Sequence, residues 1–296
     1  MSSPTIISHA TERRSLPKRF ASLVKIEHTV FSAPFAALGL FLGADGFPGW
    51  RVVSLVAIAL LSARSVAMGF NRIIDQRWDS LNPRTQTREL VTGALSRFQA
   101  ISFVVASAAI FVGASFWLNT PCGWLSFPTL VIVCGYSYIK RVSQLSHFAL
   151  GFALGLTPGA GWLAVGASLS FTPILLGMIV VFWVGGFDIL YALADEEFDK
   201  RHGLESIPAR CGATRAIFLA RLAHCLSFLM MLALYTRLDA PIWGYLTLLP
   251  VFGLFIRQHA LVSADDLSRL DAAFFTMNGW IGVALALGVG LMYFLR

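Results

Sequence analysis

Apolar residues run in long, nearly uninterrupted stretches along most of this chain, and polar residues gather in the segments between them. A helix needs about 20 mostly apolar residues to cross a bilayer, whereas a membrane β-strand needs about 10 in alternating order. The stretches here are long and continuous, which predicts helices. We expect nine membrane spans, at residues 25–45, 52–74, 98–118, 122–139, 146–166, 172–193, 214–236, 241–259 and 273–295.

The composition supports an all-α integral membrane protein with one membrane domain over residues 1–296. Hydrophobic residues make up 56% of the chain and charged residues 13%, while soluble domains average about 25% charged residues. The mean hydropathy is +0.70. The span at 146–166 carries Gly151, Gly155, Gly159 and Gly161 together with Pro158. Small residues let membrane helices approach closely, so we expect this span to pack tightly against its neighbours.

The net charge of +7 follows membrane topology and does not indicate a nucleic-acid partner. Lys and Arg gather before the first span and after spans two, four and six, while the loops after spans one, three, five and seven hold only Arg51 and Arg237. Positive residues stay on the cytoplasmic side. We therefore expect a multi-pass protein of the cell (inner) membrane with a cytoplasmic N-terminus. Residues 1–24, which lack the apolar core of a cleavable signal, are expected to form a basic cytoplasmic arm.

Two acidic motifs follow apolar spans at equivalent positions. The first reads N-R-I-I-D-Q-R-W-D (71–79), and the second reads Y-A-L-A-D-E-E-F-D (191–199). Residues four apart share one face of a helix, so each motif predicts a polar stripe. The first stripe is Asn71, Asp75 and Asp79, and the second is Tyr191, Asp195 and Asp199. Four spans separate the motifs, which places both cytoplasmic loops, expected at residues 75–97 and 195–213, on the same side.

Carboxylates crowded at one helix end need a cation, because like charges repel. Oxygen ligands suit hard divalent ions, and Mg²⁺ is typically held by one or two carboxylates together with substrate phosphates. The paired stripes therefore predict a site in which metal links aspartate to diphosphate. Arg72 and Arg77 are expected to point to other faces of the helix. The alternative is that each motif is a solvated polar helix end, but its duplication favours a functional site.

Arg64 stands two helical turns before Asn71, on the same face and deeper in the apolar span. A buried arginine costs roughly 2.5 kcal/mol or more on insertion scales and is functional by default. We expect Arg64 to clamp the carboxylate of an aromatic acid; the alternative is a structural partner for Asp188 or for a backbone carbonyl. Lys25 and Lys140 lie at cytoplasmic span ends, where each could bind phosphate or anchor the span.

The motifs as they stand resemble the UbiA superfamily of intramembrane prenyltransferases. The matching segments are N-R-I-I-D-Q-R-W-D-S-L-N-P-R-T, Y-S-Y-I-K-R and F-D-I-L-Y-A-L-A-D-E-E-F-D-K-R-H-G-L-E-S-I-P-A-R-C-G, in family order. The segment R-S-V-A-M-G-F-N resembles the 4-hydroxybenzoate polyprenyltransferases. N-P-R-T-Q-T-R-E-L with S-I-P-A-R resembles the branch assigned to menaquinone synthesis by the futalosine-type route. One departure is Arg72, where many members carry aspartate.

The resemblance implies nine transmembrane helices around a central cavity, closed by two cytoplasmic cap loops. It implies Mg²⁺ bound by Asp75, Asp79, Asp195 and Asp199 with help from Asn71. Asp188 is expected to orient or deprotonate the acceptor. The substrate-binding residues are expected to be Asn71, Arg64, Tyr191, Lys140, Lys25 and Arg141.

The reaction that the resemblance implies is transfer of a polyprenyl group from polyprenyl diphosphate to an aromatic acid. The acceptor would be 4-hydroxybenzoate or a hydroxynaphthoate, in ubiquinone or menaquinone biosynthesis, and the prenyl tail would need an apolar tunnel. Membrane lipid and the two substrates are the partners implied, with no obligate protein partner.

Several alternatives stay open. Prenyltransferases of the haem O, chlorophyll or ether-lipid type belong to the same superfamily. A secondary transporter is less favoured, because transporters tend to place ionisable sites near the midplane within inverted repeats. A CDP-alcohol phosphotransferase is disfavoured because its D-G-x-x-A-R stretch does not occur.

Overall fold

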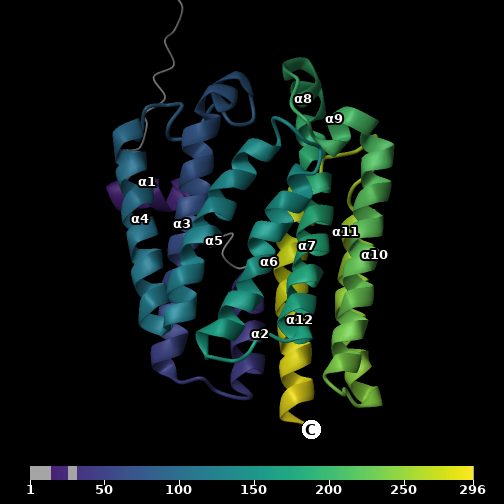
Figure 1. Ribbon diagram of the computed structural model, residues 1–296. Helices are drawn as coiled ribbons and strands as arrows, with labels where there is room; N and C mark the ends of the chain where they lie inside the picture. The colour runs from purple at the N-terminus through teal and green to yellow at the C-terminus, as the bar shows by residue number, and fades with distance from the viewer. Residues whose placement is uncertain (1–14, 26–31, 296) are drawn as a thin grey trace, which may run out of the picture.

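The computed structural model describes residues 15–25 and 32–295, which fold into a bundle of helices without a strand among them (Figure 1). The α-helices are α1 (Leu16–Leu23), α2 (Ala33–Ala44), α3 (Trp50–Leu81), α4 (Arg97–Leu118), α5 (Thr120–Ile139), α6 (Ser146–Ala164), α7 (Phe171–Tyr191), α8 (Glu196–His202), α9 (Ile207–Cys211), α10 (Ala213–Arg237), α11 (Leu249–Ala260) and α12 (Asn278–Phe294). Short 3₁₀ segments, η2 (Ala192–Asp195) and η3 (Ile242–Leu248), precede α8 and α11, and a π-helical segment, η4 (Ala272–Met277), precedes α12.

Six helical segments of the described chain are long and apolar enough to cross a membrane. These segments are Trp50–Leu81, Arg97–Leu118, Thr120–Ile139, Phe171–His202, Ala213–Arg237 and Ala272–Tyr293. The other expected spans fall on α2 and α11, which have 12 residues each, and on α6. Part of the expected first span, residues 26–31, lies outside the described residues. The structure is that of a multi-pass membrane protein, and the count of nine spans stays a prediction.

Close backbone packing holds α6 between its neighbours α2 and α7. A Cβ atom added to Gly39 of α2 would lie 1.9 Å from the carbonyl oxygen of Pro158, and one added to Gly151 would lie 2.4 Å from that of Val181. Neither distance is sterically possible, so these positions require glycine. The expected tight packing of the glycine-rich span is confirmed, and it fixes α6 against α7, the helix that leads into the second acidic motif.

The helix that carries the first motif is longer than expected. The sequence places its end at residue 74 and a loop from residue 75, but α3 continues to Leu81. It stops at Asn82, which has an extended backbone and precedes Pro83, because proline disfavours the helical conformation in the residue before it. Asp75 and Asp79 are therefore helical, as the predicted stripe requires, and the segment that leaves the helix begins later than residue 75. The connecting segment is residues 82–96.

The second motif also continues as helix. Asp195 ends the 3₁₀ segment η2, and Asp199 lies in α8, so the expected loop at residues 195–213 is largely helical. The 3₁₀ segment interrupts the regular α-helical spacing between Tyr191 and the two aspartates. The second stripe is consequently not an exact copy of the first.

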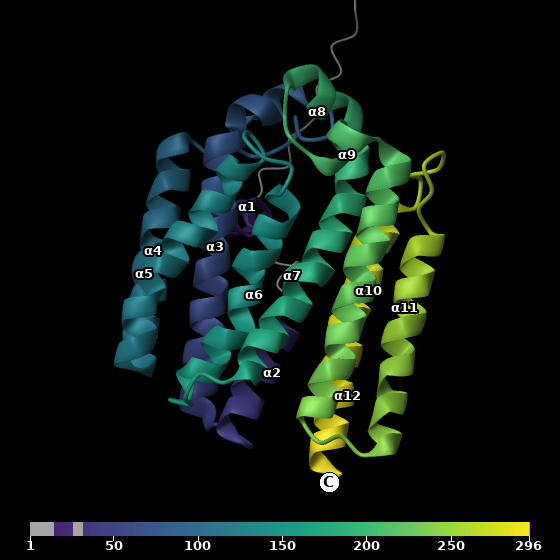
Figure 2. The ribbon, with the colours of Figure 1, turned by 45° about the vertical axis from the view of Figure 1, so that its right-hand side comes forward.

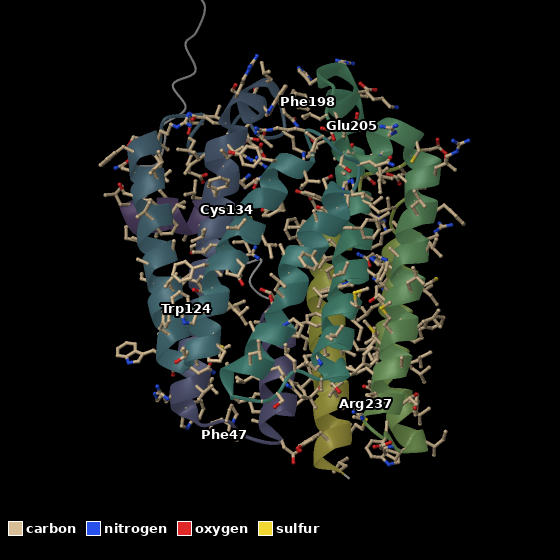
Figure 3. The ribbon with its side chains drawn as sticks, viewed as in Figure 1. Phe47, Trp124, Cys134, Phe198, Glu205 and Arg237 are labelled. Atoms are coloured by element: carbon tan, nitrogen blue, oxygen red, sulfur yellow. The ribbon has the colours of Figure 1, made fainter. Side chains whose placement is uncertain are left out.

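Both motifs lie at one end of the bundle, which also carries α8 and α9 (Figures 1 and 2). In Figure 3, Phe198 and Glu205 mark this end, while Phe47 and Arg237 lie at the opposite end, near the C-terminus. The expectation that both motifs leave the bundle on the same side agrees with this arrangement. Which end faces the cytoplasm stays a prediction.

We expect cysteine labelling to establish that sidedness. In a background without native cysteines, Ser80→Cys and Glu197→Cys should react with an impermeant maleimide only from the cytoplasmic side. Phe47→Cys, from the opposite end, should react only from outside. Ser80 and Phe47 are exposed, and the Glu197 side chain is 84% exposed, so labelling requires no unfolding. Labelling of residues 80 and 197 from opposite sides would contradict this topology.

Candidate active site

A cavity of about 370 Å³ opens among α3, α5, α6, α7 and the segment 82–96. All the site residues expected from the sequence line it: Lys25, Arg64, Asn71, Asp75, Asp79, Lys140, Arg141, Asp188, Tyr191, Asp195 and Asp199. The two acidic motifs, which are more than a hundred residues apart in the chain, thus face one space.

Each of the four motif aspartates is paired with its own cation. Asp79, Asp195 and Asp199 are buried, and Asp75 is partly buried. A buried carboxylate is costly unless it is paired. The pairs are Asp75 with Arg141 (2.9 Å), Asp79 with Arg88 (2.5 Å), Asp199 with Lys140 (2.9 Å), and Asp195 with Arg84. The cavity therefore contains a balanced set of carboxylates and cations that a bound ligand can rearrange.

The donor set fits Mg²⁺ that is shared with a phosphate substrate. Within the described parts of the chain, no group of three or more His, Cys, Asp or Glu side chains could hold a metal ion alone. Mg²⁺ commonly takes one or two carboxylates and completes its shell with phosphate oxygens and water. Asn71 donates a 2.9 Å hydrogen bond to Asp75, and Asn82 donates one of 2.8 Å to Asp195. These amides hold the carboxylates in place without supplying a closed metal cage.

Arg84 and Arg88 are site residues that the sequence interpretation missed. Their charges counted there only toward topology, yet both side chains reach back from the segment after α3 to an aspartate of the cavity. Partial desolvation lowers the pKa of Arg84, but Asp195 and Tyr191 together outweigh this effect and hold the pKa of Arg84 above its ordinary value. Arg84 therefore stays charged beside the acidic motif. The signal available in the sequence is the four-residue spacing of Arg84 and Arg88 in N-P-R-T-Q-T-R, directly after the first acidic motif.

Arg72 contradicts the expectation that it points away from the acidic stripe. Arg77 does lie on an exposed face, but Arg72 is only 4% exposed and lines the cavity. Its Nε atom has no hydrogen-bond partner among the described residues, and no described carboxylate forms an ion pair with it. Consecutive residues lie about 100° apart around a helix, so the cavity covers a wider arc of α3 than one stripe. A buried cation in this position is a ready anion ligand.

Asp188 is held by a histidine that the sequence interpretation did not single out. His147, at the start of α6, is 2% exposed, and its Nδ1 lies 2.7 Å from the Asp188 carboxylate. The other ring nitrogen accepts a hydrogen bond from the backbone N–H of Ile207 (3.3 Å). This second bond assigns the proton to Nδ1, so a neutral imidazole donates to Asp188. The pair orients the carboxylate toward the cavity that both residues line.

We expect His147→Ala to lower kcat by roughly 10- to 100-fold, the usual cost of losing a hydrogen bond to a charged group. His147→Asn, whose amide can donate in place of Nδ1, should recover part of the loss. The KM for the diphosphate that the sequence resemblance implies as a substrate should change little in either variant, because His147 contacts no motif aspartate among the described residues. Steady-state kinetics on purified protein provide the measurement. Equal losses in both variants would indicate a purely structural role.

Tyr191 is placed by aromatic packing from the far end of the chain. Its ring stacks on Phe274 at 4.1 Å, and the Arg84 guanidinium lies 4.7 Å from its centre. Phe274 belongs to the π-helical segment η4. Asn278, the first residue of α12, donates to the Phe274 carbonyl and accepts from Trp183 and Gln258. π-helical turns are often found at functional sites. Here the turn brings an aromatic side chain to the cavity wall.

A second cavity, of about 420 Å³ and almost entirely apolar, continues from the first. The two share five lining residues, Leu60, Ala63, Val133, Ala153 and Thr157. Arg64 lines the polar cavity one residue from Ala63, about 10 Å along α3 from Asn71 by helix geometry. The combined space thus runs from charged groups at the end of the bundle, past Arg64, into an apolar interior.

The sequence model of the UbiA prenyltransferase family matches residues 32–282, and the chain belongs to this family. It is similar to the 4-hydroxybenzoate octaprenyltransferases of Serratia proteamaculans (strain 568), with 27% identity over 86% of this chain and 87% of the relative. It is also similar to that of Pectobacterium carotovorum subsp. carotovorum (strain PC1), with 30% identity over 84% and 86%. The chain is thus a prenyltransferase of this family.

Solved structures agree with the fold. The apo structure of a UbiA homolog from Aeropyrum pernix K1 superimposes with a TM-score of 0.81 and 31% identity, covering 90% of this chain and 98% of the homolog. A UbiA homolog from Archaeoglobus fulgidus, bound to GPP and Mg²⁺, superimposes with a TM-score of 0.73 at 19% identity, covering 93% and 99%. The second likeness supports the fold alone.

Proposed function

We propose that this protein transfers a polyprenyl group from a polyprenyl diphosphate to an aromatic acid in the membrane. The observation that carries the proposal is the continuous space, with four cation-paired aspartates at one end and an apolar cavity at the other. A prenyl diphosphate matches this space, because it has a charged diphosphate head and a long apolar tail. The relatives named 4-hydroxybenzoate octaprenyltransferases support this substrate class.

The diphosphate head is proposed to lie among the motif aspartates, with Mg²⁺ held by Asp75, Asp79, Asp195 and Asp199. When bound, the metal neutralises charge that develops on the leaving diphosphate. The cations that pair with these aspartates can bind phosphate oxygens as well; they are Arg84, Arg88, Arg141 and Lys140. Arg72, buried and without a carboxylate partner in the described chain, adds a fixed positive charge beside them.

The acceptor is proposed to bind deeper, with its carboxylate on Arg64 and its phenol ring near Asp188. Loss of diphosphate leaves an allylic cation, which attacks a ring carbon ortho to the phenol. The ring then releases a proton, and Asp188, held by His147, is the carboxylate positioned to orient the phenol or accept that proton. The apolar surroundings keep water from the cation.

The acceptor is proposed to be 4-hydroxybenzoate or a hydroxynaphthoate. The names of the relatives favour 4-hydroxybenzoate. The segments N-P-R-T-Q-T-R-E-L and S-I-P-A-R support the menaquinone branch through their resemblance. We further propose a location in the cell (inner) membrane, on the distribution of positive charge between loops.

Mass spectrometry of reaction products tests the proposal. Purified protein is offered Mg²⁺, prenyl diphosphates from geranyl to octaprenyl, and a panel of hydroxybenzoates and hydroxynaphthoates. We expect a product with one prenyl group on the ring of an acid that keeps its carboxylate. Haem, a chlorophyll precursor and a glycerol phosphate ether are offered in parallel reactions, and products formed only from one of these would assign another branch of the family. No product with any acceptor, from protein that binds the diphosphate, would overturn the aromatic assignment.

A further inference from the structure

A second polar cavity, of about 410 Å³, lies at the same end of the bundle but on the other face of α3. It is bounded by the last turns of α3, the start of α4 and the end of α5. Three arginines line it, Arg77, Arg97 and Arg141, and Ser80, Tyr138 and Gln76 complete its polar wall. We call it the arginine pocket. It is separated from the carboxylate cavity by α3 itself, and Arg141 is the one basic residue that lines both.

Two of the three arginines of the arginine pocket have no ion pair among the described residues, whereas Arg141 is paired with Asp75. No aspartate or glutamate lines it, and neither Arg77 nor Arg97 forms an ion pair with any carboxylate that the structure describes. Arg141 is fixed in its wall by bonds to the Ile74 carbonyl (3.0 Å) and to Asp75 (2.9 Å). Like charges gathered around one hollow repel one another, and a bound anion removes that repulsion.

The surroundings of the pocket match a phospholipid better than a soluble anion. All three bounding helices are long and apolar enough to cross a membrane, so the pocket lies where such helices leave the bilayer. Along α4 from Arg97, three large apolar side chains are exposed: Phe98 is 78%, Ile101 43% and Val105 63% exposed. A lipid bound here would place its phosphate among the arginines and its acyl chains along this surface.

We propose that the arginine pocket binds the phosphate of an anionic phospholipid. Basic pockets between membrane helices attract anionic head groups, and arginine can form two parallel hydrogen bonds with a phosphate. The chemistry that the pocket recognises is the phosphate group, which a soluble phosphate also carries. The exposed apolar side chains of α4 favour a phospholipid. A phospholipid is supplied in the bilayer and inorganic phosphate in the buffer, so an experiment can separate the two.

The test compares lipid retention by full-length protein in nanodiscs of phosphatidylcholine with and without phosphatidylglycerol, read by native mass spectrometry. The wild type should retain phosphatidylglycerol with a preference of roughly tenfold or more over phosphatidylcholine. The double variant Arg77→Gln/Arg97→Gln should lose that preference. Arg215→Gln is the matched control, because Arg215 is an exposed arginine near the start of another membrane helix and lies outside the pocket; it should retain the preference.

The variant Arg77→Lys/Arg97→Lys keeps both positive charges and should retain phosphatidylglycerol. It serves as a second test if the glutamine variant is unstable, and its loss of the lipid preference would then contradict the proposal. Equal phosphatidylglycerol retention by the wild type and the glutamine variant would overturn the proposal. A thermal-stability arm with inorganic phosphate identifies the other source. If phosphate stabilises the wild type and not the glutamine variant, while phosphatidylglycerol shows no preference, the pocket binds a soluble anion and the lipid assignment is wrong.

Discussion

Replacing Asp75 or Asp195 by alanine is expected to abolish prenyl transfer, with a loss of at least roughly 10²- to 10³-fold in kcat. Groups that stabilise charge developing in a transition state typically contribute this much each. Both aspartates line the cavity and sit at the centre of a network with arginine and asparagine. Adding excess chelator to the wild-type protein should produce the same loss, and Mg²⁺ should restore it. Product formation from radiolabelled prenyl diphosphate provides the measurement.

The control for this experiment is Glu197→Ala, which removes a carboxylate close to the second motif. Its side chain is 84% exposed and pairs only with Arg201 among the described residues, so activity should change less than twofold. Membrane insertion and thermal stability of all variants are measured in parallel, because Asp75→Ala also leaves Arg141 without its carboxylate. Full activity of wild-type protein in excess chelator, or of the two aspartate variants, would exclude the proposed metal site.

Replacing Arg64 by leucine is expected to raise the KM for the aromatic acid by roughly 10- to 100-fold and that for the diphosphate little. A charged hydrogen bond contributes about 1.5–3 kcal/mol, and Arg64 lies two helical turns, about 10 Å, from Asn71. An aromatic acid could span that gap with its carboxylate on Arg64. Arg64→Lys should recover only part of the affinity, because lysine cannot form the bidentate bond. Steady-state kinetics with each substrate varied in turn make the comparison.

Arg72→Met is the matched comparison, since Arg72 is the other arginine of α3 that lines the cavity. It lies beside Asn71 at the level of the motif, so its loss should raise the KM for the diphosphate and leave that for the acid nearly unchanged. If Arg64→Leu instead raises the KM for the diphosphate and leaves that for the acid unchanged, Arg64 is a phosphate ligand. If Arg64→Leu protein merely fails to accumulate in the membrane while Arg64→Lys behaves as wild type, a structural role for Arg64 is indicated.

The class of the protein and the position of its first acidic stripe were determined by the sequence alone. Apolar length and the four-residue spacing of Asn71, Asp75 and Asp79 are local properties, and helical geometry converts them directly into spans and faces. The depth of Arg64 follows from the same geometry. The end of α3 at Leu81 was also within reach of the sequence, because Pro83 disfavours the helical conformation at Asn82.

Only the tertiary structure decided which charges meet. Arg84 pairs with Asp195 across 111 positions of the chain, and Arg141 reaches Asp75 across 66; no periodicity within one segment encodes such partners. The inward position of Arg72, the hold of His147 on Asp188, and the packing of Phe274 against Tyr191 likewise depend on how separate helices lie together. The physical reason is that helix formation is governed by neighbours along the chain, while the pairing and burial of a charge are governed by neighbours in space.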